Sequence, residues 1–201
     1  MRQCAFVLAM TVDPAVVEAD LAAGRLSCPG CGGRLAGWGY AREREVRMLD
    51  GVESLRPRRA CCQQCETTHV LLPAWSVPRR RDGAEVIGSA LLAKAEGAGH
   101  RTIAARLGRP PGTVRGWLRA FARRADTLHA VALRWIQALN VEREPVGPAG
   151  SPLADAVEAI GSAVRECRLA IGIRAGPWEL AVALTGGLLC DGWPRRDPLG
   201  V

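Results

Sequence analysis

This 201-residue chain has almost no lysine and no long apolar run. Lys94 is the only lysine among 27 basic residues, so arginine carries nearly all of the positive charge. We attribute most of this bias to a GC-rich genome, because alanine and glycine are abundant as well. No apolar segment has the length and purity of a membrane-spanning helix, so we expect no membrane partner. No nucleophile–base set and no open metal position is visible, so we expect neither an enzyme nor a small-molecule substrate.

The N-terminus and the cysteines indicate a reducing compartment. A short apolar stretch follows one positive charge and is interrupted at Asp13 and Pro14, which is too short for a signal peptide. We therefore expect a buried strand within residues 1–12 and a helix, capped by Asp13, to about residue 23. Eight cysteines without a secreted-scaffold pattern favour a cytoplasmic, nucleoid-associated protein. Four of them are scattered: Cys4, Cys61, Cys167 and Cys190.

The other four cysteines form two Cys-x-x-Cys pairs, Cys28 with Cys31 and Cys62 with Cys65. Two thiolates three positions apart at a tight turn can bind one ion, and a second pair completes a tetrahedral S₄ site. Gly32 directly after the first pair favours such a turn. The pattern predicts a zinc ribbon with one structural Zn²⁺ per chain. Zinc is favoured over iron because thiolate pairs on a β-ribbon are most often zinc sites.

Two residues compete for a place in this ligand set. Cys61 adjoins Cys62, but the two-residue gap to Cys65 favours Cys62, and Cys61 should point to the opposite face of its strand. His69 is a further candidate, although a lone histidine at a strand start is more often a surface or core residue. The long gap between the pairs predicts a hairpin of strands 38–48 and 52–59, joined near Asp50-Gly51, and a closing strand at 69–72.

Residues 100–119 have the outline of a helix-turn-helix. Gly108 stands where the first helix must stop, and Pro110 and Pro111 suit the turn and the first position of a second helix. Apolar residues lie at helical spacing on both sides of this turn, at Ile103, Ala104 and Leu107, and then at Val114, Trp117 and Leu118.

The excess positive charge lies in or beside this motif. Residues 79–124 hold eleven Lys and Arg against three Asp and Glu, a net charge of +8, whereas the whole chain carries +7. A localised basic patch on such a motif is typical of proteins that bind nucleic acid. The sequence therefore predicts double-stranded DNA as a partner.

The second helix of the motif, at about 111–124, is expected to enter the major groove. Thr113 and Arg115 near its N-terminus are the candidates for base contacts, with Arg119 next. The remaining candidates should bind mostly phosphate: Arg101, Arg106, Arg109, Arg123 and Arg124. The run 79–81 and the ribbon arginines Arg56, Arg58 and Arg59 are alternative phosphate contacts, or simply solvated charges.

The predicted fold class is α+β, with a small β-hairpin zinc ribbon followed by helices. Further helices are expected at about 83–96, 101–107, 126–139 and 153–170, and one at 178–189 broken by Gly186-Gly187. The segments 73–78 and 145–152 read as linkers. The predicted organisation is an N-terminal extension at 1–27, the zinc ribbon at 28–72, the helix-turn-helix unit at 79–124, C-terminal helices at 125–189 and a disordered tail at 190–201.

This arrangement resembles the N-terminal region of insertion-sequence transposases, where a Cys₄ ribbon precedes a helix-turn-helix. The matching positions are the four paired cysteines and residues 101–119. The chain is even more similar to an uncharacterised actinobacterial domain family with both modules and the run Leu71-Leu-Pro-Ala-Trp75. The resemblance covers about residues 25–125 and implies recognition of a DNA end or an operator. Those transposases continue into an acidic-triad nuclease domain, whereas the remaining residues here contain no such triad, so we expect no catalysis.

The function predicted from sequence is sequence-specific DNA binding, related to mobile elements and with a mobile-element protein as a further partner. One alternative is a transcriptional regulator that dimerises through the helices of 126–189, where Trp135 would be a core or dimer contact. Another is a zinc-ribbon module that binds a second protein, its basic helices serving only solubility.

Overall fold

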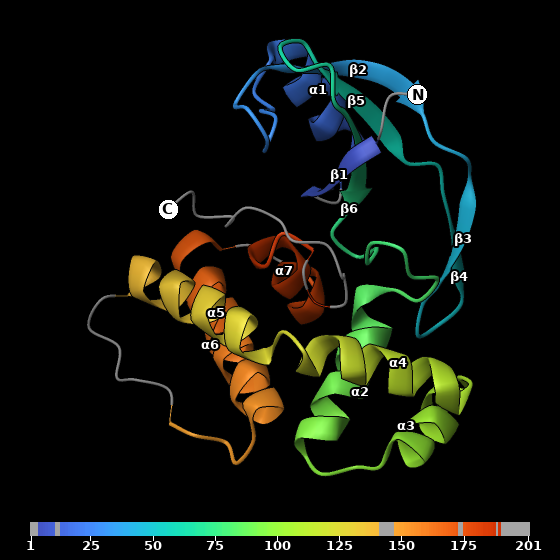
Figure 1. Ribbon diagram of the computed structural model, residues 1–201, viewed down its shortest axis with the longest axis vertical. Coiled ribbons are helices and arrows are strands. Elements are labelled where there is room, and N and C mark those ends of the chain that lie inside the picture. The colour runs from blue at the N-terminus through green and yellow to red at the C-terminus, as the bar shows by residue number, and fades with distance from the viewer. Residues whose placement is uncertain (1–3, 11–12, 141–146, 173–174, 188, 190–201) are drawn as a thin grey trace.

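The computed structural model describes residues 4–10, 13–140, 147–172, 175–187 and 189, and the main chain alone for β1, Pro14 and Ile171. Its strands lie in one half of the molecule and its helices, except α1, in the other (Figure 1). The β half comprises β1 (Cys4–Met10), α1 (Pro14–Ala23), β2 (Leu35–Tyr40), β3 (Arg44–Arg47), β4 (Val52–Leu55), β5 (Arg58–Cys62) and β6 (Thr68–Pro73). The helical half comprises α2 (Ala84–Ala95), α3 (His100–Leu107), α4 (Pro111–Ala122), α5 (Ala125–Leu139), α6 (Pro152–Ile171) and α7 (Pro177–Leu184). This segregation agrees with the α+β class.

Four strands form the main sheet, in the order β1-β6-β5-β2. β5 pairs antiparallel with both β2 and β6, whereas β1 lies parallel to β6. The expected N-terminal strand is thus present, and its partner is the strand that follows the second cysteine pair. Asp13 caps α1 by accepting from the Ala15 amide (2.8 Å), and Gly24 ends the helix at a φ of 68°.

The long hairpin predicted between the cysteine pairs is interrupted. Its tip, β3 with β4, forms a separate two-stranded sheet that turns at residues 48–51, where the Met48 amide donates to the Gly51 carbonyl (2.8 Å). Residues 41–43 and 56–57 break each long strand in two. Pro57 explains one break, because proline cannot donate to a ladder. The break lets the β3–β4 tip leave the sheet and reach the helices (Figure 1).

Residues 73–78, predicted to be a linker, are instead largely packed into the structure. Ala74, Ser76 and Val77 are at most 5% exposed, and the Trp75 carbonyl accepts from the first amide of α2 (2.8 Å). Ser76 pairs with Gly83 across an isolated bridge. The connection between the two halves is therefore fixed rather than free.

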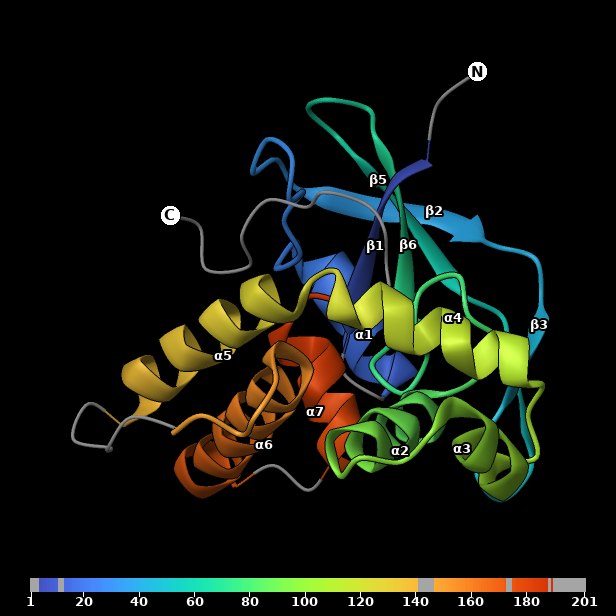
Figure 2. The ribbon, with the colours of Figure 1, turned by 60° about the horizontal axis from the view of Figure 1, so that its bottom comes forward.

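The inner faces of all the helices from α2 to α7 contribute to one apolar core. It joins Ile87 and Leu91 of α2 to Phe121 of α4, Leu128 of α5 and Ile160 of α6. Trp135 packs at the edge of this core and donates to the Leu184 carbonyl (2.8 Å), so it is a core contact. The helices predicted in two units, 79–124 and 125–189, thus share one core. They lie together in one half of the molecule (Figure 2). The tail at 190–201 and part of the linker at 145–152 lie outside the described residues.

Candidate metal centre and basic helical face

Both cysteine pairs lie in turns of the same form. In the first, the Gly32 amide donates to the Cys28 carbonyl (2.8 Å), and Gly32 has a φ of 76°. In the second, between β5 and β6, the Glu66 amide donates to the Cys62 carbonyl (3.1 Å), and Glu66 has a φ of 56°. Each turn thus places the fourth residue after its first cysteine in the left-handed region. The backbone of both turns therefore presents the thiols in the same way.

The four thiols converge on one point. The sulfur atoms of Cys28, Cys31, Cys62 and Cys65 all lie within 4.8 Å of one another. Cys28 Sγ is 3.7 Å from Cys65 Sγ, and Cys31 Sγ is 3.5 Å from Cys62 Sγ. A disulfide would bring two sulfurs to about 2.05 Å. A tetrahedral S₄ site with metal–sulfur bonds of about 2.3 Å has its sulfurs about 3.8 Å apart. The donor set therefore fits one metal ion and not a pair of disulfides.

Main-chain amides point at the sulfurs. Gly30 N–H donates to Cys28 Sγ and Gly33 N–H to Cys31 Sγ, both at 3.4 Å. In the second turn Gln64 N–H donates to Cys62 Sγ at 3.4 Å. Amide donors stabilise thiolates over thiols, so the turns favour the charged form that binds a cation.

The protons are unevenly distributed over this cluster. Hydrogen bonds from the side chain and amide of Thr67 lower the pKa of Cys65 to about 6. Burial raises the pKa of Cys28. The Gly33 amide lowers the pKa of Cys31, but hydrogen bonding with the Cys62 and Cys65 thiols outweighs it and raises that pKa to about 12. A bound cation must therefore displace protons from part of this cluster, so its affinity should rise with pH.

The two competing residues have different places. Cys61 turns away from the cluster, and its thiol donates to the carbonyls of Cys62 (3.7 Å) and Glu66 (3.5 Å). His69 is fully buried on β6 with its Nε2 3.4 Å from Cys28 Sγ. Burial lowers the pKa of His69, so the ring is neutral at neutral pH. His69 therefore stands behind a ligand sulfur, outside the set of four.

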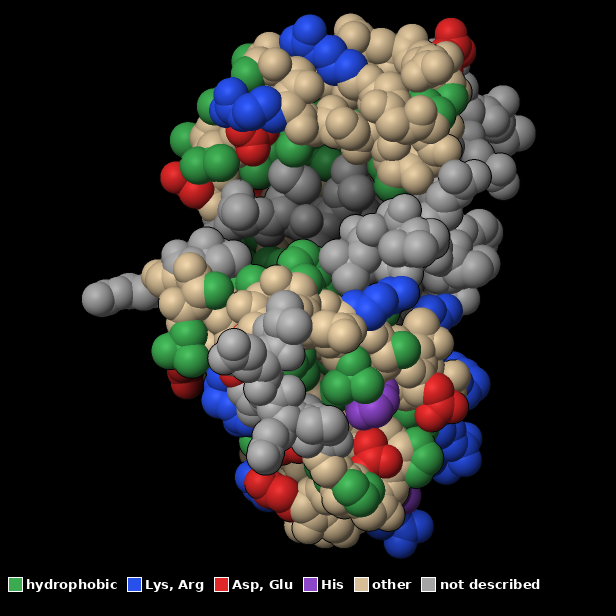
Figure 3. All heavy atoms as spheres, turned by 90° about the vertical axis from the view of Figure 1, so that its left-hand side faces the viewer, with side chains coloured by type: hydrophobic (Ala, Val, Ile, Leu, Met, Phe, Trp, Pro, Cys, Tyr) green, Lys and Arg blue, Asp and Glu red, His purple; other side chains and the backbone are tan. Residues whose placement is uncertain are grey.

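Most of the residues expected to contact DNA are exposed residues of α3 and α4. Arg115 and Arg119 on α4 are exposed, as are Arg101 and Arg106 on α3 and Arg123 just after α4. Thr113 and Arg124 are half-buried. α4 carries no carboxylate, and Val114, Trp117 and Phe121 form its inner side. On the molecular face in Figure 3, by contrast, acidic and basic side chains lie next to one another.

Arg109 is the exception in this set. Its Nε donates to Asp82 Oδ1 (2.6 Å), and its other nitrogens donate to the carbonyls of Leu107 (3.0 Å) and Met48 (3.2 Å). Arg47 NH2 donates to the second oxygen of the same carboxylate (2.6 Å), and Asp82 is only 2% exposed. Arg109, expected to bind phosphate, thus holds the α3–α4 turn to the β3–β4 tip.

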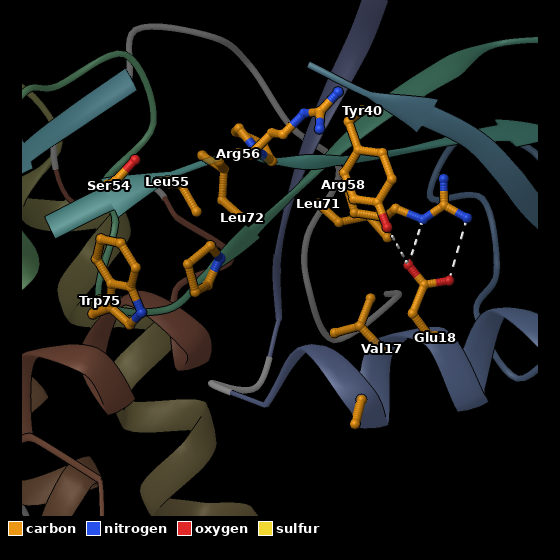
Figure 4. Close-up of a pocket in the computed structure, with 13 residues that line it drawn as sticks. Val17, Glu18, Tyr40, Ser54, Leu55, Arg56, Arg58, Leu71, Leu72 and Trp75 are labelled. Atoms are coloured by element: carbon orange, nitrogen blue, oxygen red, sulfur yellow. Dashed lines mark hydrogen bonds and ion pairs between the residues drawn. The ribbon is translucent and has the colours of Figure 1, made fainter. Parts of the chain in front are cut away.

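Two of the three ribbon arginines, Arg56 and Arg58, border a separate cavity of about 450 Å³ between α1 and the main sheet (Figure 4). Arg58 Nε donates to Glu18 Oε1 (2.6 Å), so its charge is compensated. Arg56 and Arg58 both lie over the Tyr40 ring, 5.1 and 4.9 Å from its centroid. Arg56 is exposed and Arg59 is half-buried, and neither forms an ion pair within the described residues.

Sequence reasoning missed Asp82 and the role of His69. Asp82 stands in an ordinary charged stretch, and its partners are 27 and 35 residues away. Nothing local indicates such a contact. For His69, the position four residues after Cys65 gave only the general expectation of a ligand, a surface residue or a core residue.

A domain-family model matches residues 28–108, and it is described as a domain of unknown function (DUF6431). The match begins at the first cysteine of the cluster and ends at the glycine that terminates α3. It thus contains all four cysteines and stops short of α4. It covers less than half of the chain. No curated protein and no solved structure matches the chain. Within the described residues no helix combines the length and apolarity needed to cross a membrane.

Proposed function

We propose that this chain binds double-stranded DNA through a helix-turn-helix formed by α3 and α4, next to a zinc ribbon with one structural zinc ion. Zinc suits four convergent thiolates because it takes four sulfur ligands in a tetrahedron and needs no open position when its role is structural. Cys28, Cys31, Cys62 and Cys65 would hold the ion, and the ion would supply stability to the sheet and no chemistry.

The α3–α4 pair has the form that major-groove binding needs. Only residues 108–110 separate the helices, with Gly108 at a φ of 60° and Pro111 opening α4. Ile103 and Ala104 are buried against Val114 and Trp117, so the pair is held from inside, and α2 packs behind it. The outer side of α4 is left for a partner.

The exposed stripe of α4 is the single observation that carries the proposal. Gly112, Arg115, Gly116, Arg119 and Arg123 recur at helical spacing and all are exposed. A Cβ added at either glycine would meet nothing within 4 Å, so the fold does not require glycine there. Glycines between arginines instead suit a helix that approaches a phosphate backbone and base edges closely.

A binding assay tests the proposal. We would select a preferred site from random duplexes and then compare wild type with Arg115→Ala on that site and on random DNA. We expect Arg115→Ala to lose about 1–3 kcal/mol on the preferred site and little on random DNA, because a base contact discriminates between sequences. Arg165→Ala is the matched control, since Arg165 is an exposed helical arginine on α6 paired with Glu158 (3.3 Å).

Two outcomes would count against the proposal in different ways. Equal losses on both duplexes would remove Arg115 as a base reader and leave it a phosphate contact. No binding to any duplex at low salt would contradict DNA binding altogether and favour the protein-interaction module.

The relation to mobile elements rests on the resemblance over residues 25–125, and a gene located between inverted repeats would support it. A palindromic preferred site with a stable dimer would favour a transcriptional regulator.

A further inference from the structure

A second concentration of arginine lies outside α3 and α4, on β3 and the segments beside it. A hollow of about 480 Å³ is lined there by Arg42, Glu43, Arg44, Glu45, Arg47 and Arg81. Four arginines and two glutamates thus line it. Such an excess of cations in a concave site is the usual composition of an anion site.

The protein itself compensates only part of this charge. Arg47 is paired with Asp82 (2.6 Å), and the Glu43 carboxylate accepts from the Ser54 hydroxyl. Arg44 NH2 donates to the neutral Ser76 hydroxyl (2.9 Å). Within the described part of the chain, Arg42 and Arg81 form no ion pair.

Two of the hollow's guanidinium groups also keep unused donors. The Nε atoms of Arg44 and Arg47 are buried and have no hydrogen-bond partner among the described residues. A buried donor without a partner is costly, and a negative charge nearby would offset part of that cost. Burial also lowers the pKa of Arg44, as expected where a cation has lost its water. The hollow therefore offers a net positive charge to a ligand.

The hollow is fixed relative to the helix-turn-helix. The Arg47 amide donates to the Arg81 carbonyl (2.7 Å), and the Gly83 amide donates to the Arg47 carbonyl (2.9 Å). Asp82, between these two contacts, joins Arg47 to Arg109 in the turn before α4. The β3–β4 tip consequently lies beside the end of the molecule where α4 begins (Figure 2). A duplex lying along the N-terminal end of α4 would pass this tip.

We propose that this arginine hollow binds a backbone phosphate of the same duplex, outside the base pairs that α4 reads. The inference rests on the proposed DNA binding and extends it to the β3–β4 tip. Arg42, Arg44 and Arg81 bind the phosphate oxygens, because the planar guanidinium matches them in pairs. Asp82 acts as a positioning residue that sets the distance from the hollow to α4.

The test uses Arg81→Ala and the double variant Arg42→Ala/Arg81→Ala in the full chain, loaded with zinc. Affinity for the preferred duplex and for random duplex should fall by the same factor, so that sequence preference is unchanged. The slope of log affinity against log salt should flatten by about 1 for each lost contact. Arg25→Ala is the matched control, since Arg25 is exposed in the β half and paired with Asp20.

A chemical variant of the DNA locates the contact. Single methylphosphonates, which lack the phosphate charge, are placed one at a time along the preferred duplex. We expect one flanking position to weaken wild type and to have no further effect on Arg81→Ala. Unchanged slopes in both variants, with normal wild-type binding, would overturn this inference and leave the proposed function intact.

Two further outcomes separate the sources of the anion. Inorganic phosphate that binds wild type but not Arg81→Ala, without any effect of that change on the salt slope, would assign the hollow to a free anion and overturn the DNA contact. A wild type that binds no duplex at low salt would overturn the proposed function, and this inference with it.

Discussion

His69 shows how one buried side chain can support the metal centre without being a ligand. Its Nε2 lies 3.4 Å from Cys28 Sγ, and burial keeps the ring neutral. With the proton on Nε2, the ring donates to the thiolate and holds Cys28 in the orientation that the cluster needs. Groups that orient a ligand in this way typically change metal affinity by about 10–100-fold.

We therefore expect His69→Phe to weaken zinc binding by about 10–100-fold, since phenylalanine fills the space but cannot donate. His69→Gln keeps an N–H and should lose less. Competition with a chelator of known affinity measures the effect. His129→Phe is the control, because His129 is half-buried on α5, far from the cluster. Equal affinities for wild type and His69→Phe would show that His69 only fills the core.

At the scale of the element, α4 combines a well-packed inner side with an outer side that lowers its own stability. Val114, Trp117 and Phe121 are at most 2% exposed. Gly112 and Gly116 on the other side cost helix stability, about 1 kcal/mol each against alanine in a helix interior. No internal contact requires glycine at these two positions. Their cost in helix stability is therefore consistent with a binding partner that approaches this side of α4 closely.

Gly116→Ala separates the effect of this glycine on helix stability from its effect on DNA binding. We expect it to raise the free energy of unfolding by about 1 kcal/mol, because alanine favours the helix and its methyl meets no atom within 4 Å. The same methyl should lower affinity for duplex DNA if the backbone approaches closely. Chemical denaturation and a DNA titration on the same sample measure both effects. Greater stability with unchanged DNA affinity would contradict close approach at Gly116, and Gly161→Ala on α6 provides the control for stability alone.

Most helices and strands could be predicted because their causes are local. The cap at Asp13, the turn at Asp50-Gly51 and the end of α3 at Gly108 depend on residues within a few positions. The thiol cluster could be predicted because tetrahedral chemistry restricts the spacing within each pair.

What could not be predicted depends on contacts between distant segments. The parallel pairing of β1 with β6 joins residues more than sixty positions apart. The contact of α2 with α7 is a second example, because a Cβ at Gly88 would lie 2.0 Å from the Trp178 ring. Gly88 thus permits a close approach that only the fold reveals. The sequence does not distinguish Arg109 from an exposed arginine, because its partner Asp82 is 27 residues away.

At the scale of the whole molecule, the two halves are stabilised differently. The helical half has one continuous apolar core. The core of the β half holds two cysteines of the thiol cluster, Cys28 and Cys62. Among the residues the structure describes, it holds only five other apolar side chains at its centre: Val17, Leu21, Leu35, Ala60 and Leu71. A structural zinc ion in a small module contributes about 10–16 kcal/mol to folding. If the cluster holds zinc as proposed, the ion should therefore be a major source of stability in the β half.

Removal of zinc by a chelator should then unfold the β half and leave the helices folded. Hydrogen exchange read by mass spectrometry is the suitable measurement, because it reports each segment separately. We expect β2, β5 and β6 to lose protection, while α5 and α6 keep theirs.

The β3–β4 tip shows how far the loss of hydrogen-exchange protection extends from the β half toward the helices. It belongs to the metal-dependent half by sequence but is held to the helices by Asp82 through Arg47 and Arg109. If these ion pairs suffice, the tip stays protected after chelation and the salt slope for DNA is unchanged. If the tip folds only when the zinc ribbon is folded, its protection and one phosphate contact are lost together.

The control variant is Cys61→Ser, which should behave as wild type in both measurements because Cys61 lies outside the cluster. Loss of protection in α5 and α6 as well would mean that the chain unfolds as one unit, and would contradict the separation into two cores.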